Sequence, residues 1–327
     1  MTIVNSSGAT NSVLDIRNLT VTFPNGPVVL DVSIRVAPGE IVAVIGESGS
    51  GKTMTALAVL GLLPRQARVT MGNITLSGRP LLEMPANQRR DLLGDRLAFI
   101  PQDAMRALNP VLSVGDQVGE PSVLHRSASW AAARRIAIDL LRAVHLAEPE
   151  KRAADYPHQF SGGMQQRAMI AMGLALEPEL LIADEPTTAL DVTVQAQVIN
   201  LLKDIREGHG TSILFITHDL GLVADFCDRV YVMYAGRIVE EGPVKDIFES
   251  PRHPYTAALL AATPSVLDPA EQLDAIPGQI PAVGETIAGC VFSPRCAHAR
   301  EACTSVPQQL QVSQEHRVQC WFPRGMS

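Results

Sequence analysis

Two glycine-rich loops occur on one chain, and together they limit what it can fold into. They read GESGSGKT at 46–53 and SGGMQQR at 161–167. Because one ATP needs only one phosphate-binding loop, the second loop indicates a second nucleotide or a second subunit. An apolar run that ends in an acidic pair, LLIADEP at 180–186, follows soon after the second loop. Segments in this order are typical of a chain that handles phosphate.

Four short apolar runs end in polar residues and are expected to form a mostly parallel sheet. They are IVAVI before the first loop, LAFI before Gln102, LLIA before Asp184 and SILFI before His218. Continuous apolar strands are typical of a sheet that is covered on both faces. Ligands of such sheets bind beyond the carboxyl ends of the strands. We therefore expect these polar residues to share one edge of an α/β fold.

The remaining patterns predict three further regions. Residues 13–23 and 28–36 alternate like strands around a turn, which predicts an antiparallel edge. Between about 103 and 160 the pattern is helical, and within 131–144 apolar residues three or four apart predict one buried helix face. That face comprises Ile136, Leu140, Leu141 and Val144. After about residue 246 the chain is rich in proline, which predicts a separate C-terminal extension.

Length, charge and hydrophobicity exclude several classes of protein. The 327 residues fit one large domain with an appendage. A formal net charge of −7 with no basic block argues against a nucleic-acid surface. No run approaches the roughly 20 apolar residues of a membrane span. The first residues have neither the basic nor the apolar region of a secretion signal, so we expect a cytoplasmic chain.

The first glycine-rich loop, called the phosphate loop below, has the context that nucleotide binding requires. It follows an apolar strand and opens a helix, so backbone N–H groups and a helix N-terminus face the phosphates of ATP. Lys52 reaches the β- and γ-phosphate oxygens, and the Thr53 hydroxyl is a ligand for Mg²⁺. An ordinary glycine turn does not explain Lys52. The predicted nucleotide-binding residues of this loop are Gly46, Glu47, Ser48, Gly49, Ser50, Gly51, Lys52 and Thr53.

Four further residues are candidates for the chemistry. Asp184, at a strand end, is placed to hold Mg²⁺, and Glu185 is placed to orient or deprotonate the attacking water. The alternative is that both carboxylates only cap the turn at Pro186. His218 can contact the γ-phosphate or the water, although a strand-end histidine also has structural uses. Gln102 suits a contact to Mg²⁺ or water, although a loop glutamine is also commonly just solvated.

Taken together, these motifs resemble the ATP-binding subunits of ABC transporters over nearly all of 13–245. The phosphate loop resembles Walker A, Gln102 the Q-loop, SGGMQQR at 161–167 the signature loop, LLIADEP Walker B, 189–191 the D-loop and His218 the switch histidine. The resemblance implies a head-to-tail dimer in which each ATP lies between one chain's Walker A and the other chain's signature loop. It also implies that Phe23 stacks on adenine, where the alternative is a core aromatic. The residues implied to act in trans are Ser161, Gly162, Gly163, Met164 and Asp191.

The departures from the family pattern are small. The signature loop begins with Phe160 where the broad family has Leu, and it has Met164 where the family has Gln. The serine and glycines that meet phosphate are unchanged. The implied domains are a flexible N-terminus at 1–12, an ABC ATPase domain at 13–245 with a helical subdomain at about 103–160, and an importer-type extension at 246–327.

Three stretches resemble the oligopeptide/dipeptide importer branch of this family. They are PQDAMRALNPVLSVGDQV at 101–118, SPRHPYTAALL at 250–260 and a C-terminal set of four cysteines. The resemblance implies a peripheral subunit on the cytoplasmic face of the inner membrane, bound to two membrane-spanning permeases. It implies a second, homologous ATPase, as a heterodimer rather than a homodimer, and an extracytoplasmic substrate-binding protein. The implied activity is ATP hydrolysis coupled to the import of di- or oligopeptides, with nickel, glutathione or another small cargo as the alternative.

Four of the five cysteines lie in the last 38 residues, with the spacing C-x5-C-x6-C-x16-C. Four thiolates can bind Zn²⁺ or an iron–sulfur cluster, and the spacing alone does not choose between them. Resemblance to importer subunits that carry a cluster favours a 4Fe–4S cluster in a structural role, with Zn²⁺ or free thiols as alternatives. The candidate ligands are Cys290, Cys296, Cys303 and Cys320.

A rival from a different class is a soluble ABC ATPase of DNA repair or translation. Such proteins usually carry long coiled-coil insertions or tandem ATPase domains, and this chain has neither. A subunit that binds ATP without a catalytic cycle is the other rival, and the presence of Lys52, Asp184, Glu185 and His218 argues against it.

Overall fold

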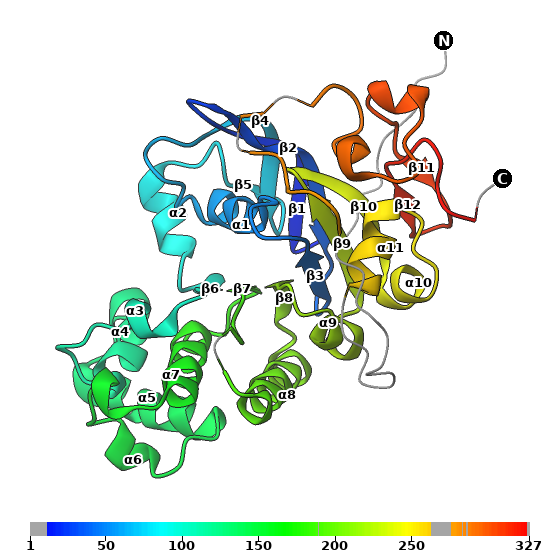
Figure 1. The fold of residues 1–327 in the computed structure, drawn as a ribbon. Coiled ribbons are helices and arrows are strands. Elements are labelled where there is room, and N and C mark those ends of the chain that lie inside the picture. The colour runs from blue at the N-terminus through cyan, green and yellow to red at the C-terminus, as the bar shows by residue number, and fades with distance from the viewer. Residues whose placement is uncertain (1–11, 189, 263–275, 283, 286, 326–327) are drawn as a thin grey trace.

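The central sheet determines where the site lies. The structure is a computed structural model that describes residues 12–188, 190–262, 276–282, 284–285 and 287–325. Within these residues the sheet has the strand order β11-β12-β10-β9-β3-β8-β7-β6 (Figure 1). Five neighbouring strands are parallel, as the apolar runs predict. They are β3 (Ile41–Ile45), β6 (Leu97–Ile100), β7 (Leu180–Asp184), β8 (Ser212–Ile216) and β9 (Arg229–Tyr234).

The antiparallel edge of this sheet comes from the C-terminal part of the chain. β10 (Arg237–Pro243) pairs with β9, and β12 (Arg317–Val318) pairs with β10. β11 (Leu310–Gln311) pairs with β12 at the outer edge. The last strands are therefore part of the central sheet, which ties this end of the chain to β9.

The N-terminal strands form the antiparallel pair that the sequence predicts, but they lie in a second sheet and not at an edge of the central sheet. β1 (Leu14–Phe23) pairs on one side with β2 (Gly26–Val36) and on the other with β4 (Arg68–Leu76). β5 (Arg79–Pro80) completes this antiparallel sheet of order β2-β1-β4-β5. The alternation of residues 13–36 identifies two strands, but it does not show that β1 also pairs with a strand that begins at residue 68.

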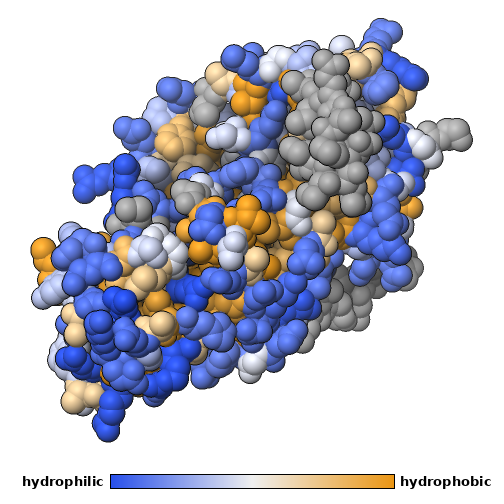
Figure 2. Space-filling view, turned by 60° about the horizontal axis from the view of Figure 1, so that its bottom comes forward, coloured by the Kyte–Doolittle hydropathy of each residue, from blue (hydrophilic) through white to orange (hydrophobic). Residues whose placement is uncertain are grey.

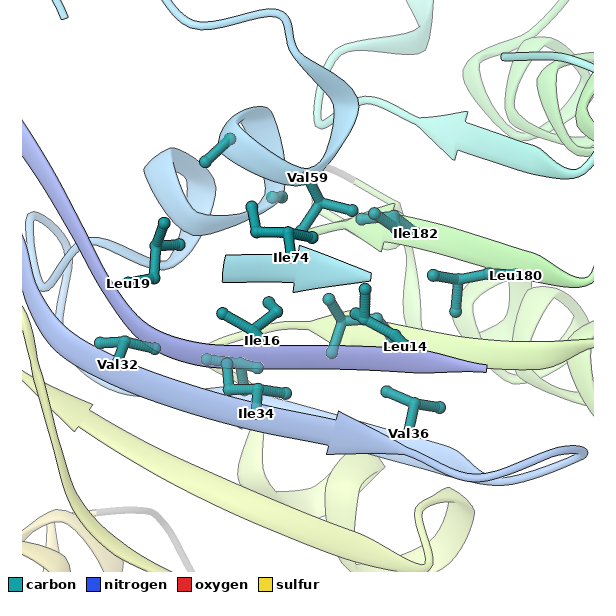
Figure 3. Close-up of a cluster of buried hydrophobic side chains, with 14 of the residues drawn as sticks. Leu14, Ile16, Leu19, Val32, Ile34, Val36, Val59, Ile74, Leu180 and Ile182 are labelled. Carbon is teal, nitrogen blue, oxygen red and sulfur yellow. The ribbon is translucent and has the colours of Figure 1, made fainter. Parts of the chain in front are cut away.

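A hydrophobic core joins the two sheets. Figure 3 shows side chains of the antiparallel sheet, of α1 (Lys52–Leu60) and of the central sheet gathered in one cluster, among them Ile16, Ile34, Val59 and Ile182. All four are at most 1% exposed. Each such side chain contributes about 1.5–3 kcal/mol when it is removed from water. This core fixes α1, and with it the end of the phosphate loop, against the sheet.

Helices α3 to α7 all come between β6 and β7 in the sequence, and they form a group at the lower left of Figure 1. Helix α5 shows why they pack together: its buried residues are Ala133, Ala137 and Leu141, one turn apart, and Val144 follows them. Ile136, expected on the buried face, is 36% exposed. The helices here are α3 (Ala104–Ala107), α4 (Val114–Arg126), α5 (Trp130–Ala143), α6 (Pro149–Arg152) and α7 (Gly162–Leu174), with a 3-10 turn at η1 (Pro157–Gln159).

The other helices cover the sheets and the C-terminal part. They are α2 (Ala86–Leu92), α8 (Val192–His209), α9 (Leu220–Phe226), α10 (Val244–Glu249) and α11 (Pro254–Ala261), with 3-10 turns η2 (Ser293–Arg295) and η3 (Glu301–Thr304). No helix in the described parts of the chain is long and apolar enough to cross a membrane. Residues 1–11 of the expected N-terminal segment and the stretch 263–275 lie outside the described residues.

A buried histidine begins helix α11. The Nδ1 atom of His253 accepts a hydrogen bond from Tyr255 N at 3.0 Å, and the ring is 1% exposed. Burial lowers the pKa of His253 to about 4, from the ordinary value of about 6.5. Below pH 6.5 this histidine takes up a proton in the unfolded chain but not in the folded chain. The free energy of unfolding therefore decreases as the pH is lowered.

We expect the free energy of unfolding to drop by about 2 kcal/mol at this site between pH 7 and pH 5. His253→Asn keeps a helix-capping acceptor but cannot be protonated, so its stability is expected to fall less over the same range. Urea unfolding of both proteins at the two pH values measures the difference. Equal losses in the two proteins would remove His253 from this role.

Candidate nucleotide-binding site

The phosphate loop runs between a buried strand and a helix, as predicted. β3 is buried at all five positions, and α1 begins at Lys52. Gly46 and Gly51 have φ of 150° and 106°, and a Cβ at Gly46 would overlap the carbonyl oxygen of Met233. Only glycine fits that conformation and that close approach. The loop therefore presents its backbone and the N-terminus of α1, which attracts phosphate.

Lys52 lies inside this loop. Its Nζ donates hydrogen bonds to the carbonyl oxygens of Gly46, at 2.8 Å, and Glu47, at 3.1 Å, and the residue is 6% exposed. Burial lowers the pKa of Lys52, while the charges of Glu185, Asp184 and Glu47 act in the opposite direction. A buried ammonium group without a full ion pair is suited to binding an anion.

Asp184 ends β7 beside the helix that follows the loop. It is 2% exposed, and its Oδ1 has no hydrogen-bond partner among the described residues. Burial raises its pKa, and a hydrogen bond with the Thr53 side chain acts in the opposite direction. A buried carboxylate oxygen without a partner, next to a hydroxyl, has the donor set of a Mg²⁺ site that keeps several waters.

Glu185 lies at the centre of a polar cluster. Its Oε2 accepts hydrogen bonds from Gln102 Nε2 at 2.8 Å and Thr188 Oγ1 at 3.0 Å. Its Oε1 lies 3.2 Å from His218 Nδ1. Glu185 has φ of 48°, which is uncommon for a residue other than glycine and is typical of functional sites. The structure thus brings together Gln102, Glu185 and His218, three residues that the sequence predicts at strand ends.

A cavity of about 620 Å³ opens above the phosphate loop. The half-buried Phe23 lines it at one side, while Lys52, Gln102 and Glu185 line it elsewhere. The other lining residues are Pro24, Asn25, Val28, Ser48, Gly49, Gly51, Thr53, Met54 and Gln66. Gly46, Glu47, Ser50 and Asp184 are not among the lining residues, although they belong to the loop or its buried support.

Several residues of the site were not predicted from the sequence. Thr188 follows Glu185 by three positions, a spacing at which a hydroxyl reaches back to a carboxylate, so a signal for it exists. Asn25 was assigned only to a turn. Val28, Met54 and Gln66 have no distinguishing pattern.

The signature loop does not line this cavity. Ser161 caps α7, since its Oγ accepts from Met164 N at 3.4 Å, and both Ser161 and Gly162 are exposed. Asp191 caps α8 in the same way, through Val194 N at 3.0 Å, and is also exposed. Ala189 of the expected D-loop lies outside the described residues. The residues predicted to act in trans are thus at a surface of the chain, away from its own pocket.

The four C-terminal cysteines are near one another but do not form a metal centre. Cys290, Cys303 and Cys320 are each 8% exposed, and Cys296 is half-buried. Burial raises the pKa of Cys320 to about 11, and the charges of the other three thiols add to this effect. Among the residues that the structure describes, no three His, Cys, Asp or Glu side chains are grouped as metal ligands. The expected iron–sulfur cluster is therefore not supported by this geometry.

Comparison with known proteins agrees with the motifs. The chain matches the ABC transporter family over residues 29–188 and the oligopeptide/dipeptide transporter C-terminal region over residues 239–303. The oligopeptide transport ATP-binding protein OppD of Salmonella typhimurium is 44% identical over 317 residues, 96% of this chain and 94% of that protein. The dipeptide transport ATP-binding protein DppD of Haemophilus influenzae is 42% identical over 316 residues, 95% of this chain and 96% of that protein.

Solved structures share the fold of the site. The dimeric, post-hydrolysis ATP-binding cassette MJ0796, bound to ADP and Pi, has a TM-score of 0.64 and 28% identity. The match covers 71% of this chain and 98% of that one. With its phosphate loop, its acidic strand end and both family matches, the chain belongs to the ATP-hydrolysing subunits of ABC transporters, in the oligopeptide/dipeptide branch.

Proposed function

We propose that this chain hydrolyses ATP to energise the import of peptides through a complex of ABC type. The observation that carries the proposal is that Phe23, residues of the phosphate loop, Gln102 and Glu185 all line the same cavity. The match of residues 239–303 to the C-terminal region of oligopeptide/dipeptide transporters supports the import role and disfavours a repair or translation ATPase.

ATP binding begins at the phosphate loop. The adenine ring stacks on Phe23, and the phosphates bind the N-terminus of α1 and the ammonium group of Lys52. Thr53, Gln102 and Asp184 would hold Mg²⁺, which supplies neutralisation of the phosphate charge when bound. The unpartnered Oδ1 of Asp184 and its hydrogen bond with Thr53 support this assignment.

Hydrolysis requires a base for the attacking water. We assign this role to Glu185, which removes the proton as the water oxygen bonds to the γ-phosphorus and the bond to ADP breaks. His218, 3.2 Å from Glu185 Oε1, positions the carboxylate or contacts the γ-phosphate. Gln102 holds the other carboxylate oxygen, so its contact links the base to the helices that follow β6.

The complete site needs a second subunit. Ser161 and Gly162 are exposed and do not line the pocket of their own chain, so they are free to meet ATP on a partner. Val192, next to the cap residue Asp191, is 79% exposed, as expected for an apolar side chain that an interface covers. The solved cassette MJ0796 to which this chain is similar is a dimer. We propose a homologous but different ATPase as the partner.

The remaining partners and the place of action follow from the importer branch. We propose two membrane-spanning permeases that contact residues 101–118, and an extracytoplasmic binding protein that delivers the cargo. Val111 and Leu112 of this stretch are 76% and 40% exposed. Figure 2 also shows hydrophobic side chains in the middle of the face at the bottom of Figure 1, and exposed apolar groups are typical of a protein interface. The chain would then act at the cytoplasmic face of the inner membrane. We propose the domain division 13–245 and 246–327 on the same grounds.

Peptide is the proposed cargo because the similar proteins of Salmonella typhimurium and Haemophilus influenzae are named oligopeptide and dipeptide transport proteins. The test is uptake into vesicles that contain this chain, the second ATPase and both permeases, with the binding protein outside. ATP-dependent uptake of a labelled di- or tripeptide is expected. Uptake of Ni²⁺ or glutathione in place of both peptides would reject peptide as the cargo.

We also propose that the four C-terminal cysteines bind a structural 4Fe–4S cluster, with Zn²⁺ as the alternative, and that the thiols shift from the arrangement described above to reach a ligand geometry. The support is that Cys290, Cys296 and Cys303 pack in one hydrophobic cluster, in which Cys290 N donates a hydrogen bond to Cys303 O at 2.9 Å. Anaerobic purification followed by an absorbance spectrum and metal analysis tests this. A colourless protein that contains zinc, or no metal, would reject the cluster.

A further inference from the structure

A buried arginine of the C-terminal extension contacts the phosphate loop. Arg295 Nη1 donates to Glu47 Oε2 at 2.6 Å, and Nη2 donates to Glu47 Oε1 at 3.1 Å. The Arg295 side chain is 5% exposed and that of Glu47 is 28% exposed. A two-pronged pair of this kind fixes the orientation of both groups, unlike a surface ion pair between flexible side chains.

The rest of the guanidinium group is also held. Its Nε donates to Pro277 O at 2.8 Å, and Nη2 also donates to Ile276 O at 3.3 Å. Nη1 donates to the hydroxyl of Tyr234 at 3.3 Å. Since most donors of Arg295 are satisfied in one geometry, the extension presents a rigid cation to Glu47.

Glu47 is fixed through its backbone as well. Its N–H donates to the hydroxyl of Tyr255 at 2.9 Å, and its carbonyl oxygen accepts from Lys52 Nζ at 3.1 Å. Tyr255 lies in the first turn of α11, so both the side chain and the N–H of Glu47 are held by residues beyond position 250. The same residue holds the lysine that the bound phosphates need.

An aromatic cluster supports these contacts. Tyr234 of β9 lies 4.6 Å from Tyr255 and 5.2 Å from Phe292, between ring centroids, and Tyr255 lies 5.4 Å from Phe292. All three rings are at most 3% exposed. Because β9 is the neighbour of β3, this cluster seats the extension directly beside the strand that leads into the phosphate loop.

We propose that Arg295 is a positioning residue that neutralises Glu47 and holds the phosphate loop in the conformation that binds ATP. Without Arg295, the Glu47 carboxylate adds an unpaired negative charge beside the phosphates and competes for Lys52. The extension thereby affects how tightly the ATPase domain binds ATP, although no residue of the extension contacts the phosphates. The inference rests on the nucleotide site proposed above.

The test is a pair of charge-removing substitutions in the complex with both permeases and the second ATPase. Arg295→Met is expected to raise the KM for ATP about tenfold, with kcat changed less than twofold, because a single uncompensated charge acts on binding. Adding Glu47→Gln to Arg295→Met removes that charge and is expected to restore KM to within about threefold of the original protein. The control is Arg317→Met, since Arg317 of the same extension pairs with Glu241 of β10 and not with the phosphate loop.

Three outcomes overturn the inference. They are an unchanged KM in Arg295→Met, a KM defect that Glu47→Gln leaves in place, and an equal defect in Arg317→Met. If Arg295→Met does not fold, Arg295→Gln removes the same charge but keeps a hydrogen-bond donor for Glu47, and a KM equal to that of the original protein then overturns the inference. If the original complex itself does not hydrolyse ATP, the proposed function fails instead.

Discussion

Glu185→Gln is expected to leave ATP binding intact and to lower turnover by about 10²- to 10⁴-fold. Glutamine keeps the size of the side chain and an oxygen that accepts from Thr188, so the local structure is preserved. It cannot take a proton from water, so the γ-phosphate stays attached. ATP and the closed dimer should accumulate together. Phosphate release by the complex with its permeases, and light scattering with ATP present, measure the two effects.

The control for this substitution is Glu207→Gln, on the exposed surface of α8. It removes the same charge at a distance from the site, and turnover should not change. If Glu185→Gln hydrolyses ATP at the original rate, Glu185 is not the base. If it loses ATP binding as well, the carboxylate acts earlier in the cycle than we propose.

The second large effect is expected from Gly162→Asp in the signature loop. A Cβ at this position meets only Leu190 Cδ2, at 4.0 Å, and the backbone does not have positive φ, so the chain can fold with the new side chain. A carboxylate in the first turn of α7 also suits the helix dipole. It would, however, repel the phosphates of ATP held by a partner. We expect the chain to bind ATP itself, while the complex loses turnover about 10²-fold or more.

The matched control is Gly208→Asp, at an exposed helix position where nothing lies within 4 Å of the added Cβ. Gly163 is unsuitable for the test, because its Cβ would approach Val194 Cγ1 to 2.7 Å and disturb folding. Turnover near the original level in Gly162→Asp would mean that the signature loop does not approach the phosphates. An equal loss in Gly208→Asp would point to an effect on folding.

Much of the central sheet was predictable because a parallel strand covered on both faces is a continuous apolar run. IVAVI, LAFI, LLIA and SILFI each form the expected strand, and the fold class is confirmed. The pairing of β1 with β4 was not predictable, because alternation marks a strand and says nothing of a partner some fifty residues away. β9 and β10 were missed, although RVYVMY is an apolar run, since no functional residue follows it.

The site was predictable where a residue type has one chemical use at one spacing, as with Lys52 after the glycines. Contacts that depend on tertiary packing could not be predicted from the sequence. Arg295 lies in a proline-rich segment with no fixed spacing to Glu47, and only the fold brings the two within 2.6 Å. For the cysteines, clustering in sequence correctly placed the thiols near one another, but it did not supply a metal-binding geometry.

The central claim, that each ATP site combines the phosphate loop of one chain with the signature loop of another, has a direct measurement. The complex is assembled with a second ATP-binding subunit of distinguishable size and labelled with 8-azido-ATP under light. Gly162→Asp in this chain is expected to reduce labelling of the second subunit and to leave labelling of this chain unchanged, while Lys52→Ala should do the reverse. Loss of label from this chain in Gly162→Asp, with the second subunit still labelled, would contradict the account.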